Sequence, residues 1–446
     1  MKINSHIFRG YDLRGIVGQD LNAEIVEHIG KAYGTYLKRK GITKAIVSRD
    51  SRRTSPEYSK VLIKGLNWAG IEVIDIGLNL IGTFYWSQYH FKIKGGVYIT
   101  ASHNPPQFNG FKFAIDYSET LVSEGMQEIK RIVEQEDYDQ AKVQGKLKEV
   151  DIRKEYFKDL VLRLPLKKKL KVVIDAGNAT SGVIAPDLLR LVGCEVIEAN
   201  CNLDSNFPLG SADPTDFIMA NRLAARVLEE RADIGFSFDA DGDRIGIADE
   251  KGHIILNDVL VALLAINVLR KHPGSVIMYN TLCSKVVEDT IKREGGIPFM
   301  WRTGHSFLKK KNQEVKAAFI GELSGHFFFS RDFYNHDDGL YSMLYLINYL
   351  SNTGLSLSST VTKLPFYISS PEIKIFCSDE KKVEVMKDIA KTLKRDFPEA
   401  DVIDDERAGD GVRLNLKDSM LVIRYSQNGP YLTIKFESKK KDQYKN

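Results

Sequence analysis

G-V-Y-I-T-A-S-H-N-P, residues 96–105, is the stretch that decides how this chain folds. Its first half is apolar and rich in β-branched and aromatic residues, which predicts a buried strand. The pair Pro105-Pro106 would interrupt a helix or a central strand, so the strand has to end before it. Ser102 is therefore expected on a tight loop at a strand end, and such loops carry active sites in α/β sheets.

His103 follows Ser102 directly, and Lys112 follows in N-G-F-K-F, which we assign to the same short loop. A hydroxyl, an imidazole and an amine close together suit a serine that gives and takes a chemical group under acid–base control. The alternative is a turn whose polar side chains only cap backbone groups. The loop alone leaves both interpretations open.

A unit of strand, polar loop, helix, glycine and strand occurs three times, within residues 45–76, 172–197 and 276–301. Such a unit is a βαβ crossover between two parallel strands. A last piece reads strand, helix and several strands. The expected fold class is therefore α/β, with three related α/β domains that contain mixed sheets and a smaller C-terminal α+β domain. Charged linkers place the domains at 1–146, 147–250, 251–366 and 367–446.

Composition excludes several classes of protein. The 446 residues carry a net charge of +4, with 43% hydrophobic and 27% charged residues. This balance argues against a nucleic-acid binder and against a polybasic membrane binder. The four cysteines form no C-x-x-C pair, and no apolar run approaches 18 residues. We expect a cytoplasmic protein that binds no nucleic acid and no membrane, as a monomer or a dimer.

D-A-D-G-D-R, residues 239–244, lies between two apolar, strand-like runs. Asp239, Asp241 and Asp243 alternate on this loop, so their carboxylates can converge on one hard cation. An EF-hand loop is the first alternative, but its sixth position requires glycine and here is Arg244. The D-x-D motif of a nucleotide-sugar transferase is the second, and it would not explain the Ser102 loop.

Three further polar loops follow apolar runs. G-E-L-S-G-H, residues 321–326, offers Glu322 and Ser324, which can hold vicinal sugar hydroxyls. R-Y-S-Q-N-G-P, residues 424–430, offers donors for an anion. W-R-T-G-H-S adds His305 as a secondary candidate. Taken alone, the first two loops also fit ordinary turns between strands.

In this order, the motifs resemble those of the α-D-phosphohexomutase superfamily, most closely its phosphomannomutase/phosphoglucomutase branch. T-A-S-H-N-P-P…N-G-F-K resembles the family's phosphoserine loop, D-A-D-G-D-R its metal loop and G-E-L-S-G-H its sugar-binding loop. R-Y-S-Q-N-G-P falls where the family has its phosphate-binding loop. The resemblance covers nearly the whole chain and implies four domains around a central cleft.

The resemblance implies an enzyme, an intramolecular phosphotransferase that interconverts hexose 1-phosphate and hexose 6-phosphate of mannose, glucose or both. A phosphoserine at Ser102 and a bound hexose 1,6-bisphosphate, as intermediate and activator, would carry the reaction. Mg²⁺ would be held by Asp239, Asp241, Asp243 and the serine phosphate. The remaining implied site residues are His103, Lys112, Arg14 and Arg244 for catalysis, and Tyr11, His305, Glu322, Ser324, His326, Arg424, Ser426 and Gln427 for binding the sugar phosphate.

Two departures from the family pattern concern the substrate. Gln427-Asn428 replace the Asn-Thr that is common in the phosphate loop, and Leu282 in N-T-L-C stands where that branch often has a lysine. The choice of sugar therefore stays open, with a phosphoglucosamine mutase as the nearest alternative. More remote alternatives are a metal-dependent nucleotide-sugar transferase and a non-catalytic calcium- or sugar-phosphate-binding protein.

Overall fold

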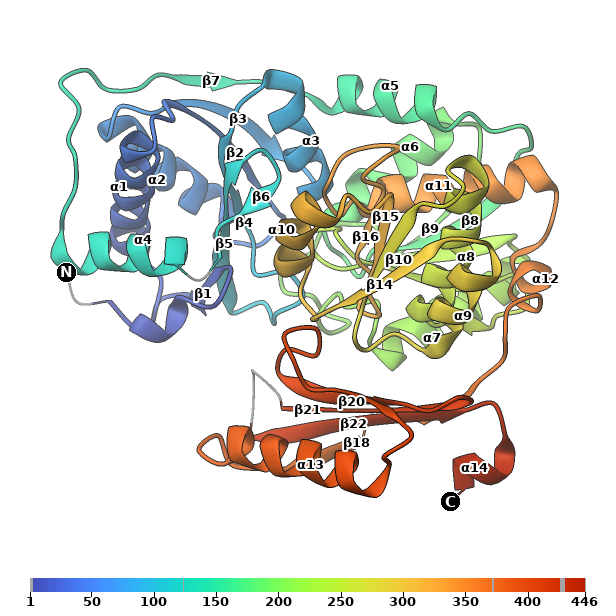
Figure 1. The fold of residues 1–446 in the computed structure, drawn as a ribbon. Coiled ribbons are helices and arrows are strands. Elements are labelled where there is room, and N and C mark those ends of the chain that lie inside the picture. The colour runs from blue at the N-terminus through green and yellow to red at the C-terminus, as the bar shows by residue number, and fades with distance from the viewer. Residues whose placement is uncertain (1–2, 123, 371–372, 426–429, 446) are drawn as a thin grey trace. The chain divides into compact units, whose positions relative to one another are not determined.

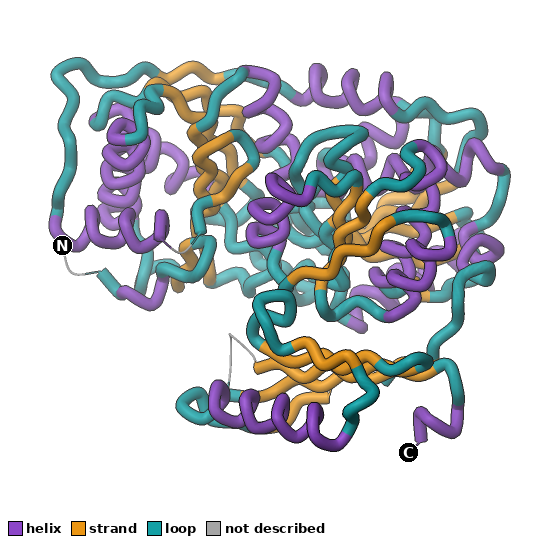
Figure 2. Tube along the Cα trace, in the orientation of Figure 1, coloured by secondary structure: helices purple, strands orange, loops and turns teal. Residues whose placement is uncertain are grey.

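A computed structural model of the protein describes residues 3–122, 124–370, 373–425 and 430–445. The chain forms two compact units. Unit 1 comprises Met1–Ile255 and Tyr334–Ser358, and unit 2 comprises Leu256–Phe333 and Ser359–Asn446. Each unit contains two β-sheets (Figures 1 and 2). Among the described residues, no helix combines the length and the apolar character needed to span a membrane.

The first sheet of unit 1 is mixed and has the strand order β1-β5-β4-β2-β3-β7, with β6 on β5. Helix α1 shows why these elements form. Asn22 caps its first turn by accepting a hydrogen bond from the Ile25 N–H at 2.9 Å, and Val26, Ile29 and Tyr33 recur on its buried face. Helices α1, α2 and α4 lie on one face of the sheet and α3 lies on the other (Figure 1). The bounds are β1 Leu13–Ile16, α1 Ala23–Arg39, β2 Lys44–Arg49, α2 Ser55–Trp68, β3 Glu72–Leu78, α3 Ile81–Phe91, β4 Gly95–Ile99, β5 Phe108–Asp116, β6 Glu119–Thr120, α4 Glu124–Gln135 and β7 Leu147–Glu149.

The second sheet of unit 1 has the order β12-β11-β10-β8-β9. Its strands β10 and β11 pair antiparallel and flank the D-A-D-G-D-R loop, so the flanks are strands rather than the helices of an EF-hand. Helix α11 packs against β11 and belongs to this unit. The bounds are α5 Arg153–Arg163, β8 Lys171–Asp175, η2 Thr180–Val183, α6 Ala185–Leu191, β9 Glu195–Ala199, α7 Phe217–Glu230, β10 Ile234–Phe238, β11 Ile245–Asp249, β12 Ile254–Ile255 and α11 Gly339–Thr353.

Unit 2 contains a mixed sheet of order β14-β13-β15-β16 and an antiparallel sheet of order β17-β22-β21-β20-β19, with β18 on β22. Helix α13 covers one face of the antiparallel sheet (Figure 2). The bounds are α8 Asn257–Lys271, β13 Val276–Asn280, α9 Lys285–Arg293, β14 Ile297–Trp301, α10 His305–Val315, β15 Phe319–Gly321, β16 Phe327–Phe328, α12 Leu357–Val361, β17 Ile368–Ser369, β18 Ile373–Phe376, α13 Lys382–Asp396, β19 Asp401–Ile403, β20 Gly411–Asn415, β21 Ser419–Tyr425, β22 Tyr431–Ser438 and α14 Lys441–Lys445.

The predicted fold class is confirmed. In each of the three repeated units the two strands pair in parallel, as β2 with β3, β8 with β9 and β13 with β14. The last piece is an antiparallel sheet with a helix, as the sequence pattern indicates. The domain limits given above stay predictions. All four cysteines are free thiols.

Candidate active site

Ser102 lies on the loop that connects β4 to β5, and its backbone is in an unusual conformation. Its φ is +48°, in the left-handed region that residues other than glycine rarely adopt. The Ser102 N–H donates to the Thr100 hydroxyl at 2.8 Å, and the Asn104 N–H donates to the Ala101 carbonyl at 3.0 Å. Non-glycine residues held in this region concentrate at functional sites, where the surrounding structure enforces them.

The Ser102 hydroxyl points at the acidic loop between β10 and β11. Its Oγ donates a hydrogen bond to Asp239 Oδ2 at 2.9 Å, and both side chains are buried. The serine loop and the acidic loop, predicted separately from sequence, therefore meet in one site of unit 1. This contact brings the serine hydroxyl into the acidic cluster.

Asp239, Asp241 and Asp243 can together hold a metal ion. Each offers one carboxylate oxygen, and these oxygens all lie within 4.8 Å of one another. Asp241 Oδ1 is buried and has no hydrogen-bond partner among the described residues. Burial and the neighbouring Asp243 and Asp241 charges raise the pKa of Asp239 well above its ordinary value. An all-oxygen donor set with a buried, unsatisfied oxygen fits a hard divalent cation.

Lys112 lies on strand β5 rather than on the serine loop, so this detail of the sequence prediction was wrong. Strand β5 is antiparallel to β4, with Lys112 opposite Tyr98, and this register directs its ammonium to the acidic loop. Lys112 Nζ donates to Asp241 Oδ2 at 2.9 Å and to Asp243 Oδ2 at 2.7 Å. Although burial opposes the charged form, the two carboxylates hold the pKa of Lys112 well above its usual value.

His103 is held as a neutral imidazole. Its Nδ1 lies 3.2 Å from Ser102 Oγ. The positive charge of Arg244 and burial together lower the pKa of His103 to about 2. Arg244 also holds down the pKa of the half-buried Asp213, although burial of that carboxyl acts in the opposite direction. The ring is therefore neutral at physiological pH, and it becomes an effective base only when added negative charge raises this pKa.

Arg14 donates hydrogen bonds to residues on both sides of Ser102 in the serine loop. It donates to the Ala101 carbonyl at 3.2 Å and to the Asn104 side chain at 2.7 Å, and it pairs with Asp12 at 2.7 Å. Its strand β1 is opposite Gly110 on β5, where a Cβ would lie 2.0 Å from the Leu13 carbonyl oxygen, so only glycine allows this approach. The Tyr11 phenol contributes to the electrostatic field at both Arg14 and Arg244.

Sequence reasoning missed three charged residues around this site. Arg52 donates hydrogen bonds to the serine loop, Asp213 lies 3.9 Å from Arg244, and buried Asp337 contributes to the field at Lys112. The motif N-H-D-D-G, residues 335–339, could have indicated Asp337. Two adjacent acids directly before an apolar helix are costly to bury unless they have partners or a function. Arg52 stands in a charged segment that reads as an ordinary surface loop.

The predicted sugar-binding residues lie in unit 2. Glu322 is buried on the turn between β15 and β16, and its Oε1 accepts a hydrogen bond from the Gly304 N–H at 3.0 Å. His305 begins α10, and its ring stacks on that of His326 with centroids 5.0 Å apart and planes at 18°. Ser324 is half-buried on the same turn. The structure thus groups Glu322, Ser324, His305 and His326 around one turn.

Arg424 lies near the end of β21 and is ion-paired with Asp410 at 2.7 Å, with a fifth of its side chain exposed. An anion that binds Arg424 has to share this guanidinium with Asp410 or displace it. The other two predicted residues of this loop, Ser426 and Gln427, lie outside the described residues.

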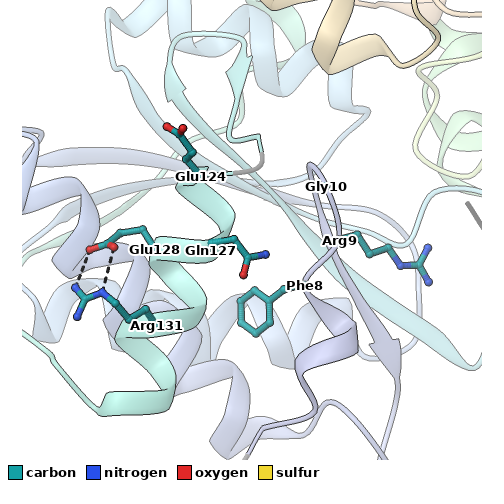
Figure 3. A pocket seen from close by; sticks show the side chains of 7 residues that line it. All are labelled: Phe8, Arg9, Gly10, Glu124, Gln127, Glu128 and Arg131. Atoms are coloured by element: carbon teal, nitrogen blue, oxygen red, sulfur yellow. Dashed lines mark hydrogen bonds and ion pairs between the residues drawn. The ribbon is translucent and has the colours of Figure 1, made fainter. Parts of the chain in front are cut away.

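A hollow on the surface of unit 1 contains none of the predicted site residues. Figure 3 shows it between the segment before β1 and helix α4. Glu128 and Arg131 form an ion pair at 2.8 Å there, and the Arg9 side chain points away from the helix. The lining residues are Phe8, Arg9, Gly10, Glu124, Gln127, Glu128 and Arg131.

Comparison with known proteins agrees with this geometry. The chain is 39% identical to a phosphomannomutase/phosphoglucomutase of Pseudomonas putida over 432 residues, which is 97% of this chain and 91% of that protein. It is 35% identical to a phosphoglucomutase of Neisseria gonorrhoeae over 437 residues, 98% of this chain and 94% of the relative.

Solved structures show the same fold. A crystal structure of a phosphoglucomutase/phosphomannomutase family protein from Burkholderia thailandensis matches with a TM-score of 0.90 at 31% identity, covering 99% of this chain and 95% of that one. An N-acetylphosphoglucosamine mutase of Aspergillus fumigatus, solved with GlcNAc-6P and magnesium, matches in fold with a TM-score of 0.64 at 12% identity, covering 100% of this chain and 94% of that one.

Family models give the assignment. Those for the alpha/beta/alpha domains I, II and III of phosphoglucomutase/phosphomannomutase match residues 5–140, 154–252 and 257–367. Because these matches span most of the chain and the relatives agree along nearly all of it, the chain belongs to the phosphoglucomutase/phosphomannomutase family.

Proposed function

We propose that this protein is a phosphohexomutase that interconverts hexose 1-phosphate and hexose 6-phosphate, with glucose, mannose or both as the sugar. The observation that supports it most is the 2.9 Å hydrogen bond from Ser102 Oγ to Asp239 inside the buried acidic cluster. It puts a reactive hydroxyl where a phosphoryl group and a metal ion would share ligands. The names of the P. putida and N. gonorrhoeae relatives support the same activity.

The reaction has two phosphoryl transfers. A hydroxyl of the hexose monophosphate attacks the phosphorus on Ser102, and a base takes the hydroxyl proton. The bond from phosphorus to Ser102 Oγ breaks, and an acid protonates the leaving Oγ. This gives a hexose 1,6-bisphosphate that stays bound and turns over. Its other phosphoryl group then returns to Ser102 Oγ, which leaves the isomeric monophosphate and restores the phosphoserine.

The residues around Ser102 divide this work. We assign the uptake of the hydroxyl proton to His103 and the return of a proton to Lys112. As described, the pKa of His103 is about 2 and that of Lys112 lies well above its usual value, so both have to shift toward neutrality for these transfers. A phosphate on Ser102 would add about two negative charges beside the His103 ring and raise its pKa. Arg14 and Arg244, with Tyr11 beside them, offset the charge that builds up on the transferring group.

Asp239, Asp241, Asp243 and the serine phosphate would hold the metal ion, and Mg²⁺ is the cation we assign. Oxygen ligands alone suit Mg²⁺, which commonly combines one or two carboxylates with phosphate oxygens. When bound, it supplies positive charge to the phosphoryl oxygens during transfer.

We assign binding of the sugar to residues of unit 2. We assign Glu322 and Ser324 to the sugar hydroxyls, with His305 and His326 beside them. Arg424, Ser426 and Gln427 would hold the phosphate that is not being transferred. Several hydrogen-bond donors suit this role because the two isomers present that phosphate from opposite ends of the sugar.

The experiment that tests the serine is intact-mass analysis of the purified protein. A fraction of the wild-type protein should carry one phosphate, and Ser102→Ala should carry none and lack activity. A fully active enzyme that is never phosphorylated would contradict the mechanism.

The sugar is tested with a coupled assay on the 1-phosphates of mannose, glucose and glucosamine. We expect turnover of the glucose or mannose ester and a much lower kcat/KM for glucosamine 1-phosphate. A preference for the glucosamine ester would assign the chain to phosphoglucosamine mutases. Nucleotide binding without phosphoserine would favour a transferase, and tight binding without isomerisation would favour a binding protein.

A further inference from the structure

Arg52 donates hydrogen bonds to the backbone of the serine loop. It lies between β2 and α2 and is only 2% exposed. One terminal nitrogen, Nη2, donates to the carbonyls of Ser102 and Asn104 at 2.5 and 2.6 Å. The other, Nη1, donates to the carbonyls of Pro105 and Phe108 at 2.9 and 3.0 Å. A single guanidinium thus satisfies four carbonyl groups of residues 102–108.

Only an arginine can make this set of contacts. A guanidinium has five N–H donors in a rigid, planar fork, whereas lysine presents three donors on one compact ammonium. Carbonyl groups that are shielded from water need donors, and of these four the Pro105 carbonyl also accepts from the Phe108 N–H at 3.1 Å. The loop also keeps Ser102 at a φ of +48°, which costs conformational energy unless other contacts enforce it.

Asp50 is the ion partner of that guanidinium, although Asp50 Oδ2 and Arg52 Nε form no hydrogen bond in the described structure. Its Oδ2 lies 3.2 Å from Arg52 Nε, and its Oδ1 accepts from the Arg52 N–H at 3.0 Å and from the Ser55 hydroxyl at 2.6 Å. The Asp50 N–H in turn donates to the carbonyl of Ile99, the last residue of β4, at 3.0 Å. The ion pair is therefore tied to the ends of β2 and β4 and to the start of α2, which are rigid parts of the first sheet.

We propose that Arg52, oriented by Asp50, is a positioning residue of the reaction. It clamps the backbone of the serine loop so that Ser102 Oγ stays beside Asp239 whether or not it carries the phosphoryl group. Arg52 reaches the loop carbonyls and does not contact Ser102 Oγ in any described bond, so it acts through the loop rather than on the substrate. This inference rests on the proposed function, because it concerns the step that Ser102 performs.

The main variant is Arg52→Gln, with Arg52→Lys as the conservative partner. We expect kcat of Arg52→Gln to fall about 100-fold, the size of effect expected when a reacting atom is misplaced by about 1 Å. KM should change little, because the sugar-binding residues are untouched. Arg52→Lys should recover part of kcat. Hydrogen exchange of peptides within 100–110 should speed up in Arg52→Gln and less so in Arg52→Lys.

Two controls separate positioning from a general loss of stability. Arg222→Gln removes an arginine that pairs with buried Asp175 at 2.6 Å in the second sheet and touches none of the proposed site residues. It should lower the unfolding temperature and leave kcat unchanged. The double variant Asp50→Asn with Arg52→Gln removes both buried charges, which limits the cost of leaving Asp50 uncompensated; it should fold and show the same low kcat.

Wild-type kcat in folded Arg52→Gln or in the double variant would overturn the proposal. If neither of these two folds, Arg52→Lys decides, and wild-type kcat there would overturn it as well. If the wild-type protein has neither mutase activity nor phosphoserine, the proposed function fails instead. In that case only hydrogen exchange tests whether Arg52 holds the loop. Unchanged hydrogen exchange of residues 100–110 in Arg52→Gln, or in Arg52→Lys if Arg52→Gln does not fold, would overturn the proposal.

Discussion

The positive charge of Lys112 offsets part of the repulsion among the three neighbouring aspartates of the described site. Its ammonium lies within 3 Å of Asp241 and Asp243, and all three groups are buried. Removing one partner of a buried ion pair typically costs about 3–5 kcal/mol, because the remaining charge stays desolvated. A divalent cation at the aspartates would offset part of that cost.

Lys112→Met should therefore lower the unfolding temperature in EDTA, and Mg²⁺ should raise it again by more than it does in the wild type. The stabilisation is about 2.7 kcal/mol when free Mg²⁺ is about 100 times its Kd. Thermal denaturation with and without Mg²⁺ measures this. Lys435→Met is the matched control, since the Lys435 side chain is only 12% exposed and pairs with Asp258 at 3.0 Å in unit 2; it should lose stability that Mg²⁺ does not restore. If Mg²⁺ raises the unfolding temperature equally in the wild type and in Lys112→Met, the prediction is wrong.

Chelation addresses the metal site through activity. Excess EDTA should abolish turnover of the hexose phosphate, and added Mg²⁺ should restore it, because a phosphate on Ser102 and the aspartates would together carry more negative charge than the nearby cations offset. Asp241→Asn should need a higher Mg²⁺ concentration for half-maximal activity. Full turnover in EDTA would argue against a metal at Asp239, Asp241 and Asp243.

At the level of single residues, the sequence was informative where function is local. Ser102 with His103, and the three aspartates, stand within a few positions of one another, so their motifs are visible without a fold. Arg52 meets the Ser102 carbonyl across 50 residues of sequence. No local spacing encodes such a contact, so only the folded chain reveals it.

At the level of elements, a helix with one polar face leaves a periodic signal in the sequence, and a fully buried helix does not. Helix α1, Ala23–Arg39, has one buried and one polar face, so its helical period is visible in the sequence. Helices α3 and α11 were not predicted. Both are buried along most of their length, so they lack a polar face and show no helical period in the sequence.

The cap of α11 gives this buried helix a pH dependence. Asp338 Oδ1 accepts from the Tyr341 N–H at 3.0 Å, and Oδ2 accepts from the Tyr156 hydroxyl at 2.6 Å. Burial raises the pKa of Asp338 to about 6. In the unfolded chain the carboxyl ionises near about pH 4. As pH rises from about 4 to about 6, the unfolded state loses this proton while the folded state keeps it, so stability falls across that window and levels off above it.

Asp338→Asn should remove this loss while keeping an oxygen to cap the helix. Relative to the wild type, its free energy of unfolding should rise between about pH 4 and about pH 6 by up to about 3 kcal/mol, the value of roughly two pKa units. Urea denaturation at several pH values measures the difference. Tyr156→Phe is a useful companion, since losing a donor to the carboxylate should raise the pKa of Asp338 further. A difference that does not change with pH would refute this account.

At the level of the whole molecule, the order of the domains could be read from the sequence, but the grouping of chain segments could not. Tyr334–Ser358 follows the third sheet in the chain, yet it belongs to unit 1. The hydrogen bond between Tyr156 and Asp338 spans 182 residues, and the Gly339 N–H donates to the carbonyl of Gly242 on the acidic loop. A Cβ at Gly339 would lie 2.5 Å from that carbonyl oxygen, so this return of the chain depends on a glycine.

The division into two units predicts how ligands protect the protein from hydrogen exchange. The proposed metal ligands and Ser102 belong to unit 1, whereas Glu322 and Arg424 belong to unit 2. Mg²⁺ alone should therefore slow exchange at residues 100–104 and 239–244 only. A hexose phosphate added with Mg²⁺ should also slow exchange at 321–326 and at the end of β21, because binding suppresses local opening of the segments it contacts. In Arg424→Gln the added protection at β21 should weaken while that at 239–244 persists. If the sugar phosphate protects unit 1 alone, Glu322 and Arg424 do not bind it, and the substrate must be held by unit 1.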